Sequence, residues 1–256
     1  MRILLTNDDG ILAPGMGALY RAVQDLGEVT VVAPETSHSG VGHAISVQTP
    51  IAARRVRVRN DFEGWAVAGR PADCVKLAML ELLDKRPDFV LSGINAGINT
   101  GVYTRYSGTV AAAAEAVIFF GVPSMAFSLE LSDQPDFDRA GRIARRIFER
   151  YAAARPPART CVNVNIPALD SGWPEGVRVC PQSMVPAGAE YDRQTDSRGG
   201  YVFQLIPGGP EPTGDAGTDT QAVLERYVAV TPLIFDATDR GALPQVSEWD
   251  WPEGFE

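Results

Sequence analysis

The sequence predicts an α/β fold built on one mostly parallel sheet. Segments typical of short buried strands alternate with segments typical of helices through the first two thirds of the chain, and this alternation characterises parallel sheets. The predicted strands cover residues 3–5, 29–33, 88–91, 123–127 and 161–166, and Pro167 ends the last of them. The predicted helices cover residues 15–26, 72–84, 107–120 and 136–154.

Two stretches are less regular. Residues 45–67 lack a regular helix or strand pattern and are long enough to hold a hairpin. Beyond residue 177 the chain becomes rich in Pro, Gly and Asp, with short strand-like pieces at 201–206 and 227–231. We therefore expect a core over residues 1–180. We expect residues 181–256 to form a C-terminal extension that contains a β-hairpin and oligomerisation elements and is not an independent domain.

Composition restricts the class of protein. With 256 residues, 45% hydrophobic and 21% charged, the chain is globular, and it lacks the 18-residue apolar run that a membrane span needs. A net charge of -9 argues against a nucleic-acid polymer or a membrane surface as partner. Cys74, Cys161 and Cys180 are odd in number, widely spaced and set among apolar residues, which indicates reduced buried thiols. Since Met1 leads directly into the first strand without a signal peptide, we expect a cytoplasmic protein.

Two adjacent carboxylates, Asp8 and Asp9, follow the first strand and precede Gly10. In open α/β sheets ligands bind in the crevice beyond the carboxyl ends of the strands. Like charges so close repel each other, and a hard divalent cation is their natural complement. The alternative is a solvated Asp-Gly turn.

The loop after the second strand holds both histidines of the protein, His38 and His43. Ser39 offers a hydroxyl oxygen to a cation, and Gly40 and Gly42 let the backbone approach a ligand. A Ser/His hydrolase is disfavoured, because neighbouring side chains rarely reach each other and no Gly-x-Ser-x-Gly motif is present. An ordinary Ser/Gly surface loop remains the alternative.

Two further segments carry candidate ligands. Asn95 lies in the Gly/Asn-rich segment 92–101 after a predicted strand, where its amide suits a cation or a phosphoryl oxygen, although turn chemistry alone explains such a segment. Ser107, Gly108 and Thr109 begin an alanine-rich helix, whose free N–H groups and dipole favour a phosphate, although a plain N-cap has the same residues. All these segments follow strands of one sheet, so they are expected to converge on a site for Mg²⁺ or Mn²⁺ beside an anion.

An ordered set of motifs resembles the survival protein SurE family, the metal-dependent 5'/3'-nucleotidases. The resemblance covers nearly the whole chain. Its motifs are Asn7-Asp8-Asp9-Gly10, Ser37-His38-Ser39-Gly40, Gly69-Arg70-Pro71-Ala72-Asp73-Cys74-Val75, Ser92-Gly93-Ile94-Asn95-Ala96-Gly97, Tyr106-Ser107-Gly108-Thr109-Val110, Asn163-Val164-Asn165-Ile166-Pro167 and Gly217-Thr218-Asp219.

The resemblance implies a Rossmann-like three-layer core and one divalent metal ion, Mg²⁺ or Mn²⁺, in each subunit. It places Asp8, Asp9, Ser39 and Asn95 around the metal, with Asp8, Asp9 and Asn95 catalytic. The phosphate contacts that we expect come from Gly40, Asn95, Ser107, Gly108 and Thr109. The resemblance also implies a homodimer or homotetramer in which C-terminal segments pack between subunits.

Departures from the family pattern include Arg70, Tyr103, Ala111, Ala116 and Ser197. None removes a proposed metal ligand. Because Tyr103 and Arg105 precede the phosphate helix, the preference for base and sugar is what these changes put in doubt.

We expect hydrolysis of nucleoside 5'- and 3'-monophosphates, with short polyphosphate as a further substrate. Either Asp could take a proton from the attacking water, direct attack by Asp8 remains open, and His43 would act as leaving-group acid or hydrogen-bond its own loop. A haloacid dehalogenase mechanism is disfavoured, because Asn7 stands where its carboxylate nucleophile must be. A non-catalytic nucleotide-binding scaffold remains an alternative. A dinucleotide-dependent oxidoreductase is disfavoured because no Gly-x-Gly-x-x-Gly follows the first strand.

Overall fold

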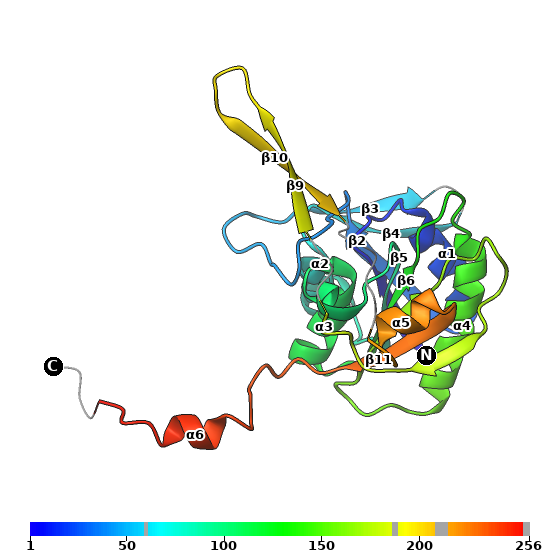
Figure 1. Cartoon of the computed structure of the whole chain (residues 1–256). Helices are drawn as coiled ribbons and strands as arrows, with labels where there is room; N and C mark the ends of the chain where they lie inside the picture. The colour runs from blue at the N-terminus through cyan, green and yellow to red at the C-terminus, as the bar shows by residue number, and fades with distance from the viewer. Residues whose placement is uncertain (59–60, 186–188, 208–214, 253–256) are drawn as a thin grey trace.

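The fold is built around a nine-stranded sheet in which neighbouring strands run mostly parallel. The structure is a computed structural model that describes residues 1–58, 61–185, 189–207 and 215–252 (Figure 1). The strand order is β3-β4-β2-β1-β5-β6-β7-β11-β8, and only the β3–β4 and β7–β11 pairings of this sheet are antiparallel. Its strands are β1 (Arg2–Thr6), β2 (Glu28–Pro34), β3 (Ala53–Val58), β4 (Phe62–Val67), β5 (Phe89–Ala96), β6 (Ser124–Leu129), β7 (Cys161–Ile166), β8 (Gly176–Val179) and β11 (Tyr227–Leu233).

Helices cover both faces of this sheet, which confirms the predicted three-layer, Rossmann-like α/β core (Figure 1). Ile3 and Leu5 of β1 pack toward α1 (Pro14–Val23) and α4 (Phe137–Ala153), while Leu4 packs toward α2 (Pro71–Leu77) and α3 (Gly108–Phe120). This division follows from the two-residue period of a strand. The remaining helical segments are η1 (Ala78–Leu82), η2 (Gly101–Arg105), α5 (Asp219–Leu224) and α6 (Leu243–Ser247). Within the described part of the chain, no helix has the length and apolarity needed to cross a bilayer.

Helix α3 begins and ends where its sequence predicts. The Ser107 hydroxyl accepts a hydrogen bond from the Val110 N–H at 3.1 Å, which caps the first turn. At the other end Gly121 adopts a left-handed conformation with φ 66°, which a residue with a side chain rarely adopts. The alanines between them let the buried helix lie close to the sheet.

The carboxyl ends of β1, β2 and β5 meet at one edge of the sheet, because these strands are parallel neighbours. Thr6 at the end of β1 pairs in register with Ser92 of β5. The segments after β1 and β2 and the last residues of β5 therefore lie at the same edge of the sheet, as the sequence predicts.

The Gly/Asn-rich segment is only partly a loop. Strand β5 continues to Ala96 and pairs with β6, with a bulge between Ser92 and Asn95. A Cβ at Gly93 would lie 2.3 Å from the Phe127 carbonyl oxygen, so the close approach of the two strands requires glycine there. The expected strand end at residue 91 was therefore five residues too early.

The C-terminal part contains the expected hairpin and a strand of the main sheet. Strands β9 (Ala189–Thr195) and β10 (Tyr201–Pro207) pair antiparallel and project from the body (Figure 1). Strand β11 lies between β7 and β8. The division of the chain at residue 180 stays a prediction.

Candidate functional site

Asp8 lies at the end of β1 and is only 6% exposed. Its main-chain oxygen accepts a hydrogen bond from the His38 N–H at 2.8 Å, and its carboxylate accepts one from the Thr109 hydroxyl. The preceding residue fixes the turn, because the Asn7 side chain bonds both the carbonyl (2.9 Å) and the N–H (3.2 Å) of Gly10. Asn7 thus has a structural task.

Burial perturbs both carboxylates of the turn. Desolvation raises the pKa of Asp8 to about 6, with a smaller upward contribution from Asp9, while the Thr109 hydroxyl opposes the shift. Desolvation also raises the pKa of Asp9, against the Ala96 N–H that donates to it at 2.9 Å. No cationic side chain of the described residues contributes to either shift. A buried carboxylate beside a half-buried one, without a positive partner, fits a divalent cation.

Asn95 and Ser39 stand next to residues that contact this pair. Asn95 donates its amide N–H to the Gly97 carbonyl at 2.8 Å, so its oxygen is the atom that can face a cation. Ser39 follows His38, whose N–H is bound to Asp8, and its hydroxyl lies 3.5 Å from that of Ser37. Among the described residues no three His, Cys, Asp or Glu side chains converge as a metal-binding group, so a cation here would need neutral oxygens as well. The ligand set Asp8, Asp9, Ser39 and Asn95 stays a prediction.

The start of α3 lies directly against Asp8. A Cβ at Gly108 would stand 2.8 Å from the Asp8 Cβ and 2.9 Å from the Pro71 Cγ, so only glycine allows this approach. The N–H groups of Gly108 and Thr109 belong to the first helical turn, where no intrahelical acceptor exists, and the helix dipole adds partial positive charge. The Thr109 N–H also stabilises the Asp8 carboxylate, because its hydrogen bond lowers the pKa of that group. The helix start is thus a favourable place for an anion beside the carboxylate pair, and an anion site there stays a prediction.

The structure distinguishes the predicted phosphate-binding residues from one another. The Ser107 hydroxyl is engaged as the N-cap, and the Thr109 hydroxyl orients Asp8. Gly40 has φ 71°, and a Cβ built there meets nothing within 4 Å, so its backbone borders open space. Their contacts with phosphate stay predictions.

Sequence reasoning missed Glu115, which is 1% exposed within α3. One carboxylate oxygen lies 2.6 Å from the Lys76 Nζ, and the other lies 2.8 Å from the His43 Nε2. His43 therefore contacts α3, not only its own loop as the structural alternative had it, and a part in acid catalysis is not tested by this contact. The signal in the sequence was an acidic residue inside the alanine run of a predicted buried helix.

Asp219 supports the loop before α3. It is fully buried at the start of α5 and accepts hydrogen bonds from the N–H groups of Gly101 and Ser183, each at 2.8 Å. The sequence showed Asp219 only as part of the motif Gly217-Thr218-Asp219 and gave no sign of these partners.

Asn99 belongs to a buried amide cluster. Its side-chain amide donates to the Ser128 hydroxyl at 2.8 Å. Its main-chain carbonyl accepts from the side-chain amides of Asn163 at 2.7 Å and Asn165 at 3.2 Å. This cluster fixes the segment between β5 and η2.

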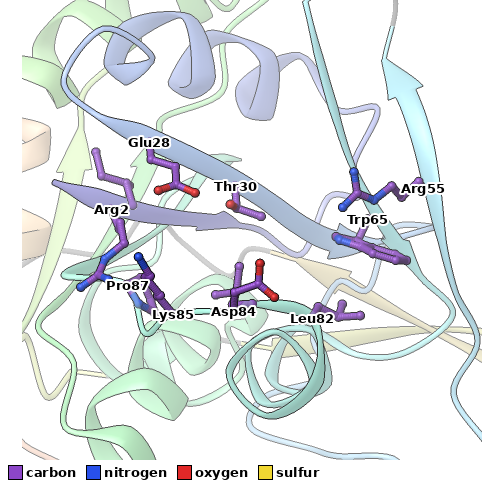
Figure 2. Close-up of a pocket in the computed structure, with 11 residues that line it drawn as sticks. Arg2, Glu28, Thr30, Arg55, Trp65, Leu82, Asp84, Lys85 and Pro87 are labelled. Atoms are coloured by element: carbon purple, nitrogen blue, oxygen red, sulfur yellow. The ribbon is translucent and has the colours of Figure 1, made fainter.

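Two cavities differ in their position relative to Asp8. A groove of about 460 Å³ runs beside α3 and is lined by His43, Arg105, Val110 and Ala114, among others. A pocket of about 310 Å³ opens at the amino ends of β1 and β2, where Arg55 stacks over Trp65 at 5.0 Å (Figure 2). The second pocket is at the opposite edge of the sheet from Asp8 and has no part in this site.

Comparisons with known proteins find relatives that match nearly the whole chain. The family model described as Survival protein SurE matches residues 3–187. A 5'-nucleotidase SurE of Syntrophobacter fumaroxidans is 41% identical over 250 residues, covering 98% of this chain and 100% of that protein. Another from Desulforudis audaxviator is 43% identical over 258 residues, covering 98% and 99%. The crystal structure of the SurE protein from Aquifex aeolicus superposes with a TM-score of 0.83 at 36% identity, covering 96% of this chain and 98% of that one.

Proposed function

The chain belongs to the survival protein SurE family, and on that premise we propose that it is a divalent-metal-dependent phosphatase that hydrolyses nucleoside 5'-monophosphates to nucleoside and phosphate. The observation that supports this most directly is the contact between Asp8 and the start of α3. Through this contact, the carboxylates that favour a cation lie beside a helix N-terminus that favours an anion. A phosphate monoester bound together with a divalent cation would satisfy both.

The residues of the chain have separable tasks in this reaction. Asp8 and Asp9, with Ser39 and Asn95, would hold Mg²⁺ or Mn²⁺, which would supply Lewis-acid chemistry to the phosphoryl group and to a water. The Thr109 hydroxyl keeps the Asp8 carboxylate in one orientation. The first-turn N–H groups of α3 stabilise the charge on the remaining phosphoryl oxygens. One of the two Asp carboxylates accepts the proton of the attacking water.

Several finer features belong to the same proposal. They are action on 3'-monophosphates and short polyphosphate, one metal ion per subunit, assembly as a homodimer or homotetramer, a cytoplasmic location, and the absence of nucleic-acid polymers and membranes among the partners. The nucleoside would occupy the groove beside α3, which Arg105 lines.

Phosphate release from a panel of 5'- and 3'-nucleoside monophosphates and tripolyphosphate tests the proposal. The protein is assayed after chelation and again with Mg²⁺ or Mn²⁺ restored. We expect restored turnover in the wild type and at least a hundredfold loss in Asp8→Asn, because one charge of the cation site is gone. The matched control is Asp25→Asn, which neutralises an exposed carboxylate of α4's ion-pair network.

Near wild-type turnover of Asp8→Asn, or turnover that survives chelation, would refute the proposed site. Tight binding of nucleotide by the wild type without any phosphate release would instead identify a non-catalytic binding protein.

A further inference from the structure

A buried carboxylate in the middle of α3 joins three elements. Glu115 is 1% exposed and contacts the Lys76 Nζ of α2 at 2.6 Å and the His43 Nε2 at 2.8 Å. The Lys76 ammonium also lies over the Phe119 ring at 4.3 Å from its centroid. Burying a carboxylate is costly unless partners compensate it, so these contacts determine where the His43 loop can lie.

The His43 loop, residues 36–46, carries Ser39 and Gly40. Main-chain hydrogen bonds tie it to β1 through His38 and Asp8 (2.8 Å) and to the residue before Ser107 through Gly42 and Tyr106 (2.9 Å). At its far end the Ser46 hydroxyl donates to Asp73 at 2.8 Å. Between these ties, Ser39 and Gly40 are exposed, and His43 supplies the contact from the loop into the body of α3.

We propose that His43 is a positioning residue: through its contact with Glu115 it holds the 36–46 loop against α3. Ser39 then lies where it can reach the cation held by Asp8, and Gly40 lies where it can reach the phosphate at the helix start. This inference rests on the proposed function. The Lys76 ammonium balances the charge of the buried Glu115 carboxylate. The other carboxylate oxygen is therefore available to hydrogen-bond His43. Without His43, the loop must be ordered when the cation binds, and the lost conformational entropy weakens binding.

The affinity for the cation separates this role from acid catalysis, because the contact with Glu115 engages only one of the two imidazole nitrogens. The His43 Nε2 is occupied by Glu115, on a part of α3 well past its first turn. A positioning residue changes the affinity for the cation, and saturation with the cation restores turnover. A leaving-group acid changes the maximal turnover whatever the cation concentration.

Calorimetric titration of the metal-free, full-length protein with Mn²⁺ tests the proposal. We compare the wild type with His43→Ala and His43→Gln, because the Gln amide nitrogen can take the place of the imidazole Nε2 and donate to Glu115. The dissociation constant should rise about tenfold in His43→Ala, as for other residues that orient metal ligands, and stay within about twofold in His43→Gln. At saturating Mn²⁺, kcat of His43→Ala should return to near wild type.

A double-mutant cycle with Glu115→Gln shows whether His43 acts through Glu115. We expect His43→Ala to cost much less in the Glu115→Gln background than in the wild type. If Glu115→Gln does not fold, the two His43 variants decide alone, since His43 is partly exposed and its replacement leaves the core intact.

The outcomes separate the two levels of the argument. A wild type that binds no Mn²⁺ overturns the proposed function. A wild type that binds Mn²⁺ with the same affinity as His43→Ala overturns only the positioning role. The same holds for a large kcat loss in His43→Ala at saturating Mn²⁺ with an unchanged dissociation constant.

Discussion

Replacing Asp8 by Asn should make the metal-free protein more stable while abolishing its activity. Burial raises the pKa of Asp8 from 3.8 to about 6, so the fold favours the neutral carboxyl. A rise of about two pKa units corresponds to about 3 kcal/mol of destabilisation by the charged form. This penalty is absent below about pH 4, grows between pH 4 and 6, and is complete above pH 6.

Asparagine has the same shape, still accepts a hydrogen bond from Thr109 and carries no charge. We therefore expect Asp8→Asn to gain up to about 3 kcal/mol at pH 7.5 without metal, seen as a rise in Tm of roughly 2–4 °C for each kcal/mol. Saturating Mn²⁺ should raise the Tm of the wild type and leave that of the variant nearly unchanged.

Differential scanning calorimetry in chelator from pH 4 to pH 8 measures this difference. The gain should vanish at the acidic end and reach its plateau above pH 6. If Asp8→Asn lost stability at pH 7.5, or gained stability to the same extent at every pH, the destabilisation could not be assigned to the charge of Asp8.

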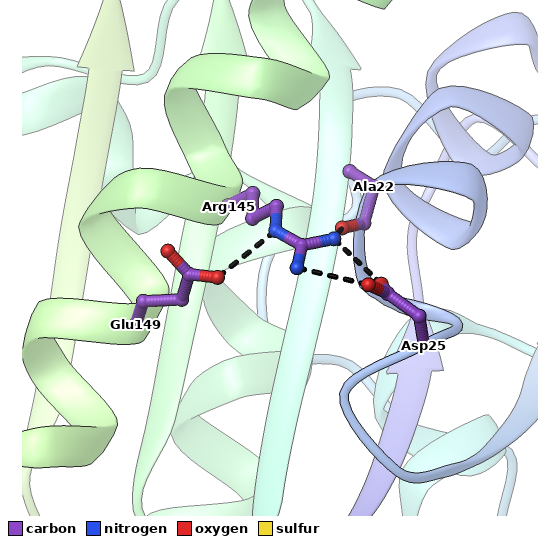
Figure 3. A network of polar contacts seen from close by, with 4 residues as sticks. All are labelled: Ala22, Asp25, Arg145 and Glu149. Carbon is purple, nitrogen blue, oxygen red and sulfur yellow. Dashed lines mark hydrogen bonds and ion pairs between the residues drawn. The ribbon is translucent and has the colours of Figure 1, made fainter.

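Asp25→Asn is a control with the opposite sign. Asp25 is bound by Arg145 at 2.5 and 3.0 Å, and the same guanidinium reaches Glu149 at 2.9 Å (Figure 3). The hydrogen bond from Arg145 lowers the pKa of Asp25, so its charge stabilises the fold above the ordinary carboxyl pKa, and this contribution is lost as the pH falls through the lowered value. Asp25→Asn should thus lower Tm slightly at pH 7.5, where Asp8→Asn raises it.

Three further substitutions test the frame of the site. Gly108→Ala places a methyl 2.8 Å from the Asp8 Cβ; urea unfolding should show a cost of about 1–3 kcal/mol, and the displaced carboxylate should reduce kcat/KM about a hundredfold. Ser107→Ala removes the cap of α3, with a loss of about 1 kcal/mol in urea and a higher KM for substrate. Asp219→Ala leaves buried N–H groups without an acceptor and should cost about 3 kcal/mol by the same measurement.

The layers and the site edge were predictable because they depend on local patterns. Alternating strand and helix signals imply parallel strands, and parallel strands bring their carboxyl ends to one edge. Asp8, Asp9 and Asn95 were therefore expected together before their contacts were known. The Ser107 cap of α3 also lies where the sequence places it.

The remaining features depend on contacts that are distant in the sequence. Strand β5 runs through Gly93 and Asn95 because β6 pairs with it, and tertiary pairing outweighs the turn preference of these residues. Strand β8 has only four residues and none of them is buried, so the pattern that reveals buried strands is absent there. Glu115 resembled an ordinary helix residue until the partners from α2 and the His43 loop were known.

Helix α3 explains why these features occur together. Its first turn faces Asp8, the Thr109 hydroxyl orients that carboxylate, and Glu115, two turns later, holds the His43 loop. One rigid helix therefore contacts the proposed cation ligand Asp8, carries the proposed phosphate donors and binds the loop that holds Ser39 and Gly40. Its small side chains are what permit this, because Ala112, Ala113 and Ala116 are fully buried against neighbouring layers. A larger residue there would shift the helix as a unit, and all three functions would change at once.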